Sequence, residues 1–473
     1  MIYDLKGWFR SGTPWVWLNA AAVSASIIIV AGLLLLIAVR GMGHFWPKSI
    51  MDAQYKNDEG QLEHLIGERH DVEVVPAERL RGAGVDVPEG ITEMRRLLIK
   101  VGNRDVSGTD FRWVLEPRLE QVTVPQNLMT LERREWGNFY GYLKAVKENG
   151  TAVAEGDAAW DALQTRLERV RELDEKIRTI EKGEIGSINY KLEQLRLDER
   201  RMELAREINP ARLAAIEEER RQLRAHYEGL QGELQALSEA NGRDSLIAGI
   251  AGGGEVEIAL SKVVHAYRPN AMSLPVKMGF YVKKFWEFLT DEPREANTEG
   301  GIFPAIFGTV MMVILMSIFV TPFGVVAAVY LREYARQGPL TRIIRIAVNN
   351  LAGVPAIVYG VFGLGFFVYF LGGQIDQLFY PEALPSPTFG SGGILWSSLT
   401  LAILTVPVVI VATEEGLSRI PKSIREGSLA LGATKAETLW RTVLPMASPA
   451  MMTGLILAIA RAAGEVAPLM LVG

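Results

Sequence analysis

The stretch IFPAIFGTVMMVILMSIFVTPFGVVAAVYL, residues Ile302–Leu331, decides the fold of this chain. It contains no aspartate, glutamate, lysine, arginine or histidine. It is also longer than the roughly 20 apolar residues that a helix needs to cross the hydrocarbon core of a bilayer. Further apolar runs lie at Val16–Val39, Ala347–Ile375, Ala383–Thr413 and, shorter, at Met446–Ala460. One buried helix of a globular protein can imitate one such run but not all of them, so the pattern predicts an α-helical membrane protein with five spans.

The first run, Val16–Val39, is interpreted as a retained spanning helix that ends near Arg40. Its apolar core is longer than the h-region of a cleaved signal peptide, and no clear small-x-small cleavage site follows it. Residues 1–40 are therefore expected to form a short terminal segment and the first membrane span.

The composition excludes several kinds of chemistry. The 473 residues contain no cysteine, which removes disulfides, thiol nucleophiles and cysteine-based metal sites together. The 5 histidines are scattered, with no pair at helix-face spacing, so no metal site is expected. No G-x-x-x-x-G-K-[ST] loop occurs, so ATP is expected to be bound by a partner. The chain is therefore expected to have no cofactor and no enzymatic activity of its own.

Charges in the short loops predict the orientation of the spans. The loop after the second run is basic and the loop after the third is acidic, the charged side chains being Arg332, Glu333, Arg336, Arg342 and Arg345 in the first and Asp376 and Glu382 in the second. Because basic loops stay on the cytoplasmic side of a membrane, the N-terminus is expected in the cytoplasm. Residues 41–300 are then expected on the periplasmic or extracellular side.

The sequence pattern of the outer residues 41–300 changes along the chain. Residues 41–155 indicate an α+β region, with strand-like pieces at Asp71–Val75, Arg96–Val101 and Phe111–Leu115. Residues 246–300 are interpreted as a linker, with a flexible breaker at Gly249–Gly254, followed by an amphipathic helix on the membrane surface at Val276–Leu289.

Residues 156–245 carry seams of the coiled-coil type. Apolar residues recur at steps of three and four along Leu163, Leu167, Val170, Leu173, Ile177 and Ile180, and again along Leu223, Tyr227, Leu230, Leu234 and Leu237. Gly183–Gly186 and Asn209-Pro210 interrupt the pattern, and a proline disrupts the interior of a helix. Helices folded back on one another are therefore expected. We favour a solvated structural hairpin, with a docking arm for a partner as the alternative.

The segment Ile420–Pro449, IPKSIREGSLALGATKAETLWRTVLPMASP, lies between the fourth and fifth runs and includes most of the expected cytoplasmic loop 414–445. It predicts a helix–turn–helix. The signals are, in chain order, a first-turn proline, a helix-ending glycine, a T-x-x-E capping box and a helix-stopping proline: Pro421, Gly432, Thr434 with Glu437, and Pro445. A compact elbow of this kind suits a membrane subunit that receives a push from a soluble motor.

The same segment resembles the coupling signature of bacterial ABC importer permeases, E-A-A-x-x-x-G followed by nine residues and I-x-L-P. Glu426 and Gly432 have the required separation, and Leu444-Pro445 stand at the matching end. Gly427-Ser428 replace the alanine pair, and Thr442 stands where isoleucine is usual. The resemblance implies that the helix Ser423–Ala433 docks in a groove of a partner ATPase, with the coupling residues Glu426, Gly432, Ala433, Leu444 and Pro445.

Other segments are similar to phosphate ABC permeases of the PstA type. They are GIFPAIFGT at Gly301–Thr309, YLREYA at Tyr330–Ala335, LAGVPAIVYGVFG at Leu351–Gly363, REGSLALGA at Arg425–Ala433 and ARAAGEVAPL at Ala460–Leu469. The resemblance is loose over Trp15–Val39 and close over Gly300–Gly473. It implies a type I ABC importer transmembrane domain in a bacterial inner membrane, carrying an α+β and coiled-coil periplasmic insertion.

The resemblance also implies a set of partners and a substrate. The partners are a second phosphate permease subunit, two copies of an ATP-binding subunit and a periplasmic phosphate-binding protein, and the substrate is phosphate. Permeases of this family usually continue with a further helix after the G-E-x-A-P segment. The permease core at 301–473, with spans two to five, is therefore expected to lack a final helix.

Arg461 and Glu465 form the most unusual pair in the apolar segments, four residues apart and expected on one helix face. A charge at mid-bilayer costs about 2.5–3.5 kcal/mol, so such residues usually face a pathway or a partner. The planar fork of arginine also suits an oxyanion. We interpret Arg461 as lining the substrate pathway, with Glu465 holding it. The alternative is a self-neutralising pair or a lock between permease subunits.

One departure from the family pattern leaves the identity of the transported anion open. Val411 stands where the phosphate family often has an arginine, so a second basic residue for the anion would come from the partner subunit. A permease for sulfate, molybdate or phosphonate is therefore an alternative. A membrane-anchored sensor or scaffold, in which the coiled coil is the working part, is the alternative from another class.

Overall fold

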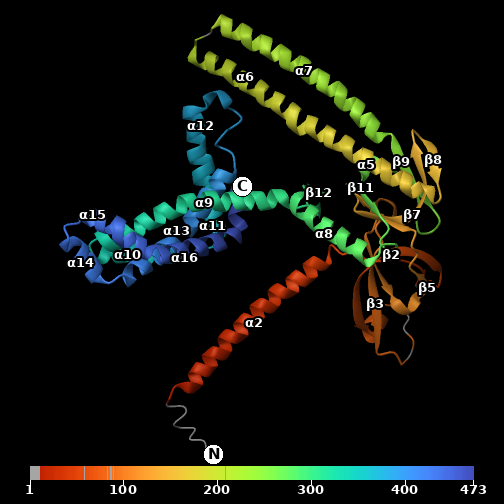
Figure 1. The fold of residues 1–473 in the computed structure, drawn as a ribbon, viewed down its shortest axis with the longest axis horizontal. Helices are drawn as coiled ribbons and strands as arrows, with labels where there is room; N and C mark the ends of the chain where they lie inside the picture. Colours follow the sequence, from red (N-terminus) through yellow and green to blue (C-terminus); the bar gives the residue numbers. More distant parts are fainter. Residues whose placement is uncertain (1–10, 58, 83, 86–87, 89, 208) are drawn as a thin grey trace, which may run out of the picture. The chain divides into compact units, whose positions relative to one another are not determined.

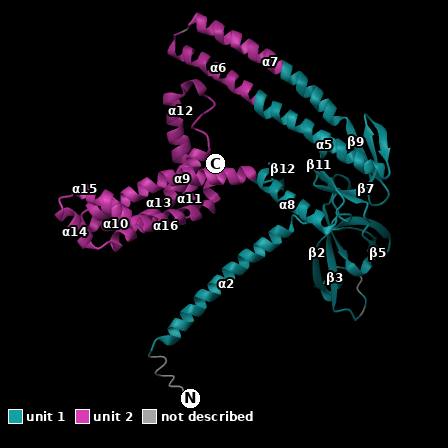
Figure 2. Ribbon diagram, viewed as in Figure 1, with its two compact units in different colours: residues 1–185, 229–302 teal, residues 186–228, 303–473 magenta. Residues whose placement is uncertain are grey.

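The computed structural model describes the chain from residue 11 onward, apart from residues 58, 83, 86–87, 89 and 208 (Figure 1). It divides into two compact units (Figure 2). Unit 1 comprises the chain up to Ile185 together with Gly229–Ile302, and unit 2 comprises Gly186–Glu228 and Phe303–Gly473.

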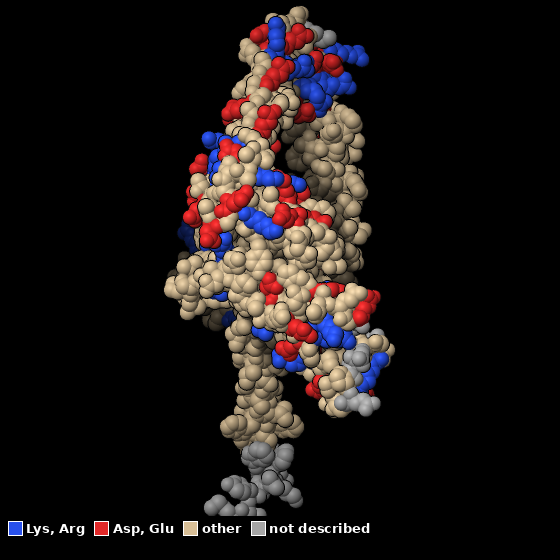
Figure 3. Space-filling view, turned by 90° about the vertical axis from the view of Figure 1, so that its right-hand side faces the viewer, with Lys and Arg blue, Asp and Glu red and all other residues tan. Residues whose placement is uncertain are grey.

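Unit 1 begins with the long apolar helix α2, Thr13–Gly43. It ends in a basic last turn at Arg40 and none of its residues is buried, as expected for a helix whose surroundings are lipid. In Figure 3 the lower length of this helix is free of charged side chains, whereas lysines, arginines and acids are scattered over the rest of the visible face. We call residues 44–302, between α2 and the next apolar helix, the inter-span domain.

The first sheet of the inter-span domain is antiparallel, in the order β4-β3-β2-β1-β5. Its strands are β1 Ile50–Lys56, β2 Leu62–Pro76, β3 Glu93–Lys100, β4 Phe111–Leu115 and β5 Leu119–Thr123. The predicted strand pieces fall within β2, β3 and β4, except that Val101 follows the end of β3. Short helical turns connect the strands at α3 Ala77–Gly82, α4 Arg104–Ser107 and η1 Glu116–Arg118.

The second sheet has the order β10-β9-β7-β6-β11, with β8 paired to β7. Its strands are β6 Leu128–Arg133, β7 Asn138–Glu148, β8 Thr151–Glu155, β9 Asp244–Gly249, β10 Glu255–Ala259 and β11 Val263–Tyr267, the last two joined by η3 Leu260–Lys262. The predicted linker at 246–300 is therefore wrong in its first part. The glycines at 252 and 253 have positive φ and form the turn of the β9–β10 hairpin. The prediction failed because β9 pairs with β7, a strand far away in the sequence.

Helix α5, Ala158–Arg178, covers the second sheet with the predicted seam residues Leu163, Leu167 and Val170, all buried against the sheet. A π-helical turn, η2 Thr179–Ile185, carries it directly into α6, Gly186–Ala205. The expected interruption at Gly183–Gly186 is thus wrong, because the extra residue of a π-turn is absorbed without leaving the helix.

The interruption at Asn209-Pro210 is present. Helix α7, Pro210–Gly242, returns antiparallel after it (Figure 1), and the Asn209 side chain accepts hydrogen bonds from the first amides of α7. Within unit 2, Arg220 of α7 pairs with Glu199 of α6 at 2.6 Å. In the same unit Arg201 of α6 pairs with Glu382, in the loop that follows the third span, at 2.5 Å.

The remaining part of the inter-span domain leads toward the next span. Helix α8, Leu274–Thr290, lies where the sequence predicted an amphipathic helix. A two-residue hairpin ladder, β12 Pro293–Arg294 and β13 Glu299–Gly300, follows it.

Unit 2 contains the other apolar helices, and the part of the chain that is described holds five helices long and apolar enough to cross a membrane, α2 included. The elements are α9 Phe303–Val329 with η4 Tyr330–Tyr334, α10 Pro339–Leu351, α11 Ala356–Phe362 with η5 Gly363–Gly372 and α12 Gly373–Phe379, η6 Pro381–Ala383, α13 Ile394–Arg419, α14 Lys422–Ala430, α15 Lys435–Thr438, η7 Leu439–Val443, α16 Leu444–Ala463 and α17 Ala467–Val472. The five predicted runs each lie on one of these spans, with the ends shifted by several residues.

Helix α13 is the centre of unit 2 and packs against α9 and α16. Glycines let the backbones approach: a Cβ atom at Gly324 of α9 would lie 2.7 Å from Val409, and one at Gly454 of α16 would lie 2.6 Å from Ala412. Small residues at such crossings are how helices associate in a membrane, where there is no hydrophobic force between them.

Candidate functional site

The candidate site is the elbow, defined as residues 420–445, which joins α13 to α16. Its first helix, α14, starts after Pro421, so Pro421 is the residue before the helix and not, as predicted, in its first turn. Gly432 ends the helix with φ +90°, a conformation that side chains with a Cβ avoid. The predicted capping box is present, since Thr434 and Glu437 exchange hydrogen bonds of 2.9 and 3.2 Å.

Pro445 does not stop the second helix of the elbow, which corrects the prediction. The π-helical turn η7 precedes it, and Pro445 lies in the first turn of α16. The amide of Leu444 bonds the carbonyl of Leu439, five residues back. This widened turn changes the i→i−4 pattern that a proline would otherwise break, so the helix runs from Lys435 through the proline into the span.

Buried apolar contacts hold the elbow against the long helices. Leu417 and Ile420 from the end of α13 form one cluster with Leu439, Val443 and Ala447. Between its two helices, the hydroxyls of Ser428 and Thr438 lie 2.9 Å apart. The elbow is therefore a rigid extension of α13 and α16 and not a loose loop.

Arg425 is the residue that the sequence analysis did not single out. Its guanidinium donates to the carbonyls of Leu417 and Ile420, both at 2.8 Å, and to the carboxylate of Glu333 at 2.9 Å. Glu333 belongs to η4, at the end of α9. The only signal in the sequence was that both residues lie in segments similar to known permeases, and nothing local indicated that they meet.

The free surface of the elbow includes two large exposed apolar side chains and an exposed acid, among other charged residues. Leu431 is 91% exposed and Trp440 is 75% exposed, which is unusual for side chains of this size. Glu426 is also exposed, and no hydrogen bond or ion pair to another described residue holds its carboxylate. Of the other predicted coupling residues, Ala433 and Leu444 are half-buried, and Gly432 and Pro445 are exposed.

Arg461 and Glu465 form a pair, but not on one helix face as predicted. Helix α16 ends at Ala463 with Gly464 after it, so Glu465 lies in the connection to α17. The Arg461 Nε atom is 3.5 Å from the Glu465 carboxylate, and its Nη1 donates to the carbonyl of Ala352 at 3.1 Å. Ala352 follows the last residue of α10, so Arg461 joins the ends of two helices and keeps further N–H donors available.

The predicted coupling residues thus all lie in the elbow, and Arg461 lies apart from them. Leu444 and Arg461 lie at opposite ends of α16, about 25 Å apart at 1.5 Å per helical residue. A single small ligand cannot contact both places.

Taken together, the spans and the elbow define a helical membrane domain with an exposed elbow between its last two long helices. Residues 320–473 match the family of binding-protein-dependent transport system inner membrane components. The match is confined to this region, which is similar to the permease domains of that family.

Individual relatives agree with this assignment. The chain is 35% identical over 206 residues to the phosphate transport system permease protein PstA of Mycobacterium leprae, covering 43% of this chain and 62% of that protein. It is 38% identical over 175 residues to the phosphate transport system permease protein PstA 1 of Mycobacterium tuberculosis, covering 37% of this chain and 52% of that protein. The chain thus spans little more than half the length of these curated relatives.

A solved structure, the inward-facing MetNI methionine ABC transporter, is 19% identical, covering 34% of this chain and 68% of that chain, with a TM-score of 0.27. At a TM-score this low the likeness says nothing about how the helices are arranged.

Proposed function

We propose that this chain is a permease subunit of an ATP-driven importer, which forms the transmembrane pathway for inorganic phosphate and couples it to a partner ATPase. The observation that carries the proposal is the elbow. Its frame is buried while Glu426, Leu431 and Trp440 are exposed, which is the arrangement that a docking helix needs.

The coupling follows from how the elbow is attached. The buried cluster joins it to α13 and α16, and the ion pair between Arg425 and Glu333 joins it to the end of α9. A displacement at Leu431 is therefore passed to three long helices as a rigid-body movement. Such movements switch a membrane domain between two states of access.

The assembly follows from the same role. A second permease subunit would complete the pathway, two ATP-binding subunits would dock on the elbows, and a periplasmic phosphate-binding protein would deliver the substrate. In this assembly the chain lies in the bacterial inner membrane, with its N-terminus in the cytoplasm and residues 41–300 in the periplasm. Phosphate as the substrate rests on the names of the relatives.

For the anion we propose Arg461. Its guanidinium donates one hydrogen bond to the Ala352 carbonyl and lies within ion-pair distance of the Glu465 carboxylate. Further N–H donors therefore remain for an oxyanion. Glu465 competes with the anion for the same guanidinium, which allows the anion to leave. The rest of the positive charge would come from the second subunit.

Uptake of radiolabelled phosphate at low external concentration tests the proposal, in cells that lack the gene and in the same cells complemented with it. Phosphate uptake should be lost in the cells that lack the gene and restored by the wild-type gene. The variants Arg461→Ala and Glu426→Ala should both fail to restore it. The matched controls Arg419→Ala and Glu415→Ala, on exposed residues at the end of α13, should restore it fully.

The outcomes separate the parts of the proposal. If uptake persists without the gene, once other phosphate systems are removed, phosphate is not the substrate. If excess sulfate or molybdate abolishes the complemented uptake, the pathway serves another oxyanion. Restoration by Glu426→Ala would reject the elbow as the coupling site, and immunoblots of the membranes show whether each variant is present.

A further inference from the structure

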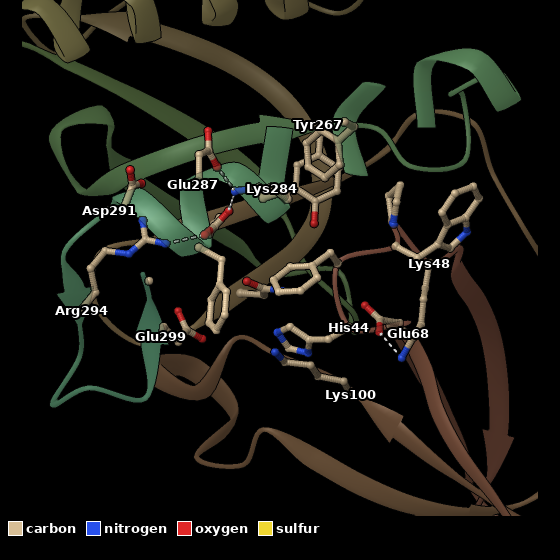
Figure 4. A pocket seen from close by; sticks show the side chains of 18 of the residues that line it. His44, Lys48, Glu68, Lys100, Tyr267, Lys284, Glu287, Asp291, Arg294 and Glu299 are labelled. Carbon is tan, nitrogen blue, oxygen red and sulfur yellow. Dashed lines mark hydrogen bonds and ion pairs between the residues drawn. The ribbon is translucent and has the colours of Figure 1, made fainter. Parts of the chain in front are cut away.

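A charged pocket lies in the inter-span domain, next to the end of α2 (Figure 4). Its volume is about 330 Å³, at the lower end of the roughly 300–1,000 Å³ typical of small-ligand sites. The segment after α2, the strands β2 and β3, helix α8 and the β12–β13 hairpin contribute its walls. All of these belong to unit 1.

Several of the charges in the pocket already have partners. Lys48 pairs with Glu68 at 3.2 Å. Lys284 contacts both Glu132 and Glu287, and Arg294 contacts the same Glu132. These side chains neutralise one another and form the fixed wall of the pocket.

Two half-buried charged side chains of the pocket are left over, while the exposed Asp291 at its edge accepts a 3.5 Å hydrogen bond from Thr290. Among the residues that the structure describes, neither the Lys100 ammonium nor the Glu299 carboxylate has a hydrogen bond or an ion pair, although both are half-buried. Figure 4 shows Lys100 beside the His44 ring and Glu299 facing the same space. Lys100 is the last residue of β3, between its register partners Glu68 and Phe111, so its position is fixed by the sheet.

Two groups that line the pocket have shifted pKa values. Burial raises the pKa of Glu299, and burial together with the charges of Lys100 and Lys48 lowers the pKa of His44. A ligand cation at Glu299 and a ligand anion at Lys100 and His44 would reverse both shifts. The pocket is therefore complementary to a small molecule that carries both charges.

The surroundings indicate where such a molecule comes from. His44 directly follows the last residue of α2, and Glu299 precedes the span α9 by only a few residues. The rings of Phe45 and Phe285 pack at 5.6 Å beside the pocket, and α8 exposes Val282 and Trp286. Aromatic rings and an amphipathic helix with an exposed apolar side are typical of the membrane–water interface.

We propose that this pocket binds the headgroup of a phosphatidylethanolamine, with the phosphate diester at Lys100 and His44 and the ammonium at Glu299. Inorganic phosphate fits less well, because it leaves the Glu299 carboxylate without a partner. The site is independent of the anion that the permease domain carries.

Native mass spectrometry of the full chain in detergent tests the proposal, with palmitoyl-oleoyl phosphatidylethanolamine and the matching phosphatidylglycerol titrated separately. The wild type should prefer the ethanolamine lipid. Glu299→Gln should weaken the binding of that lipid about tenfold and leave the binding of phosphatidylglycerol unchanged, whereas Lys100→Gln should weaken the binding of both lipids about tenfold. Lys100→Arg should restore binding.

Lys144→Gln is the matched control, since Lys144 forms an exposed pair with Glu255 in the second sheet; it should change neither lipid. Equal binding of the two lipids by the wild type, or an ethanolamine affinity untouched by Glu299→Gln, overturns the proposal. Displacement of the lipid by millimolar inorganic phosphate also overturns it and makes this a phosphate site. If Lys100→Gln fails to fold, the lipid binding of Lys100→Arg and Glu299→Gln still tests the proposal.

Discussion

Replacing Arg425 by alanine is expected to detach the elbow from the end of α9 while leaving the long helices folded. The guanidinium contacts two carbonyls at the end of α13 and the carboxylate of Glu333. Its side chain is 19% exposed and that of Glu333 is 13% exposed. Removal therefore leaves a largely buried carboxylate without its partner.

The size of the effect follows from these contacts. A hydrogen bond to a charged group contributes about 1.5–3 kcal/mol, and removing one partner of a fully buried pair costs about 3–5 kcal/mol. The contacts of Arg425 are not additive and retain some solvent, so we expect a loss of about 3 kcal/mol in the local stability of α14. Since about 1.4 kcal/mol is a factor of ten, the population of the locally open elbow should rise about 100-fold.

Hydrogen–deuterium exchange on the full chain in detergent measures this population, because the amides of α14 exchange through local opening. Exchange in Lys422–Ala430 should be about 100-fold faster in Arg425→Ala, with α13 unchanged at its buried centre. Glu333→Gln should give a smaller increase, since the carbonyl contacts of Arg425 remain. Arg419→Ala, which removes an exposed arginine six residues earlier, is the matched control.

Unchanged exchange in α14 would refute the reasoning, because the elbow would then be held by its apolar cluster alone. An equal increase in Arg419→Ala would also refute it, as it would make the effect one of net charge.

Burial by itself would raise the pKa of Glu287, but the hydrogen bond with His265 and the Lys284 charge hold it at about 2, against the ordinary 4.5. The ionised Glu287 therefore stabilises the inter-span domain fully above pH 4.5, and this stabilisation is lost as the pH falls toward 2. Thermal unfolding should show that the stability difference between wild type and Glu287→Gln shrinks by up to about 3 kcal/mol over that range. A stability difference that does not change with pH would contradict this. Asp376, fully buried, accepts hydrogen bonds from the amides of Phe389 and Gly390 at 2.8 and 2.7 Å. Asp376→Ala should cost about 2–4 kcal/mol and speed proteolysis of the loop 381–393, whereas the same cleavage rate in variant and wild type would show that the loop does not depend on it.

Local sequence patterns were sufficient to predict the features that are stabilised by residues close together in the chain. Each apolar run predicts a span because transfer of its own side chains into lipid decides its position. The capping box at Thr434 and the turn at Asn209-Pro210 were predictable for the same reason, since each depends on groups within four residues. The resemblance to known permeases located the elbow and its exposed acid, Glu426.

Other features depend on partners far away in the sequence. Strands β9 to β11 looked like a linker because their pairing with β6 and β7 is not visible in their own composition. Pro445 looked like a helix stop because a π-turn, which changes the bonding before it, has no sequence signal. Glu465 was expected on the helix of Arg461, yet the chain turns at Gly464.

The sequence by itself determined that this chain has membrane spans and a large inter-span domain between the first and second of them, because transfer free energies and caps act within short segments. Only the tertiary structure decided which charges meet. Arg425 pairs with Glu333, whereas Lys100 and Glu299 line one pocket without a hydrogen bond or ion pair to any residue that the structure describes. The physical reason is that pairing of charges depends on distances between segments that no local pattern encodes.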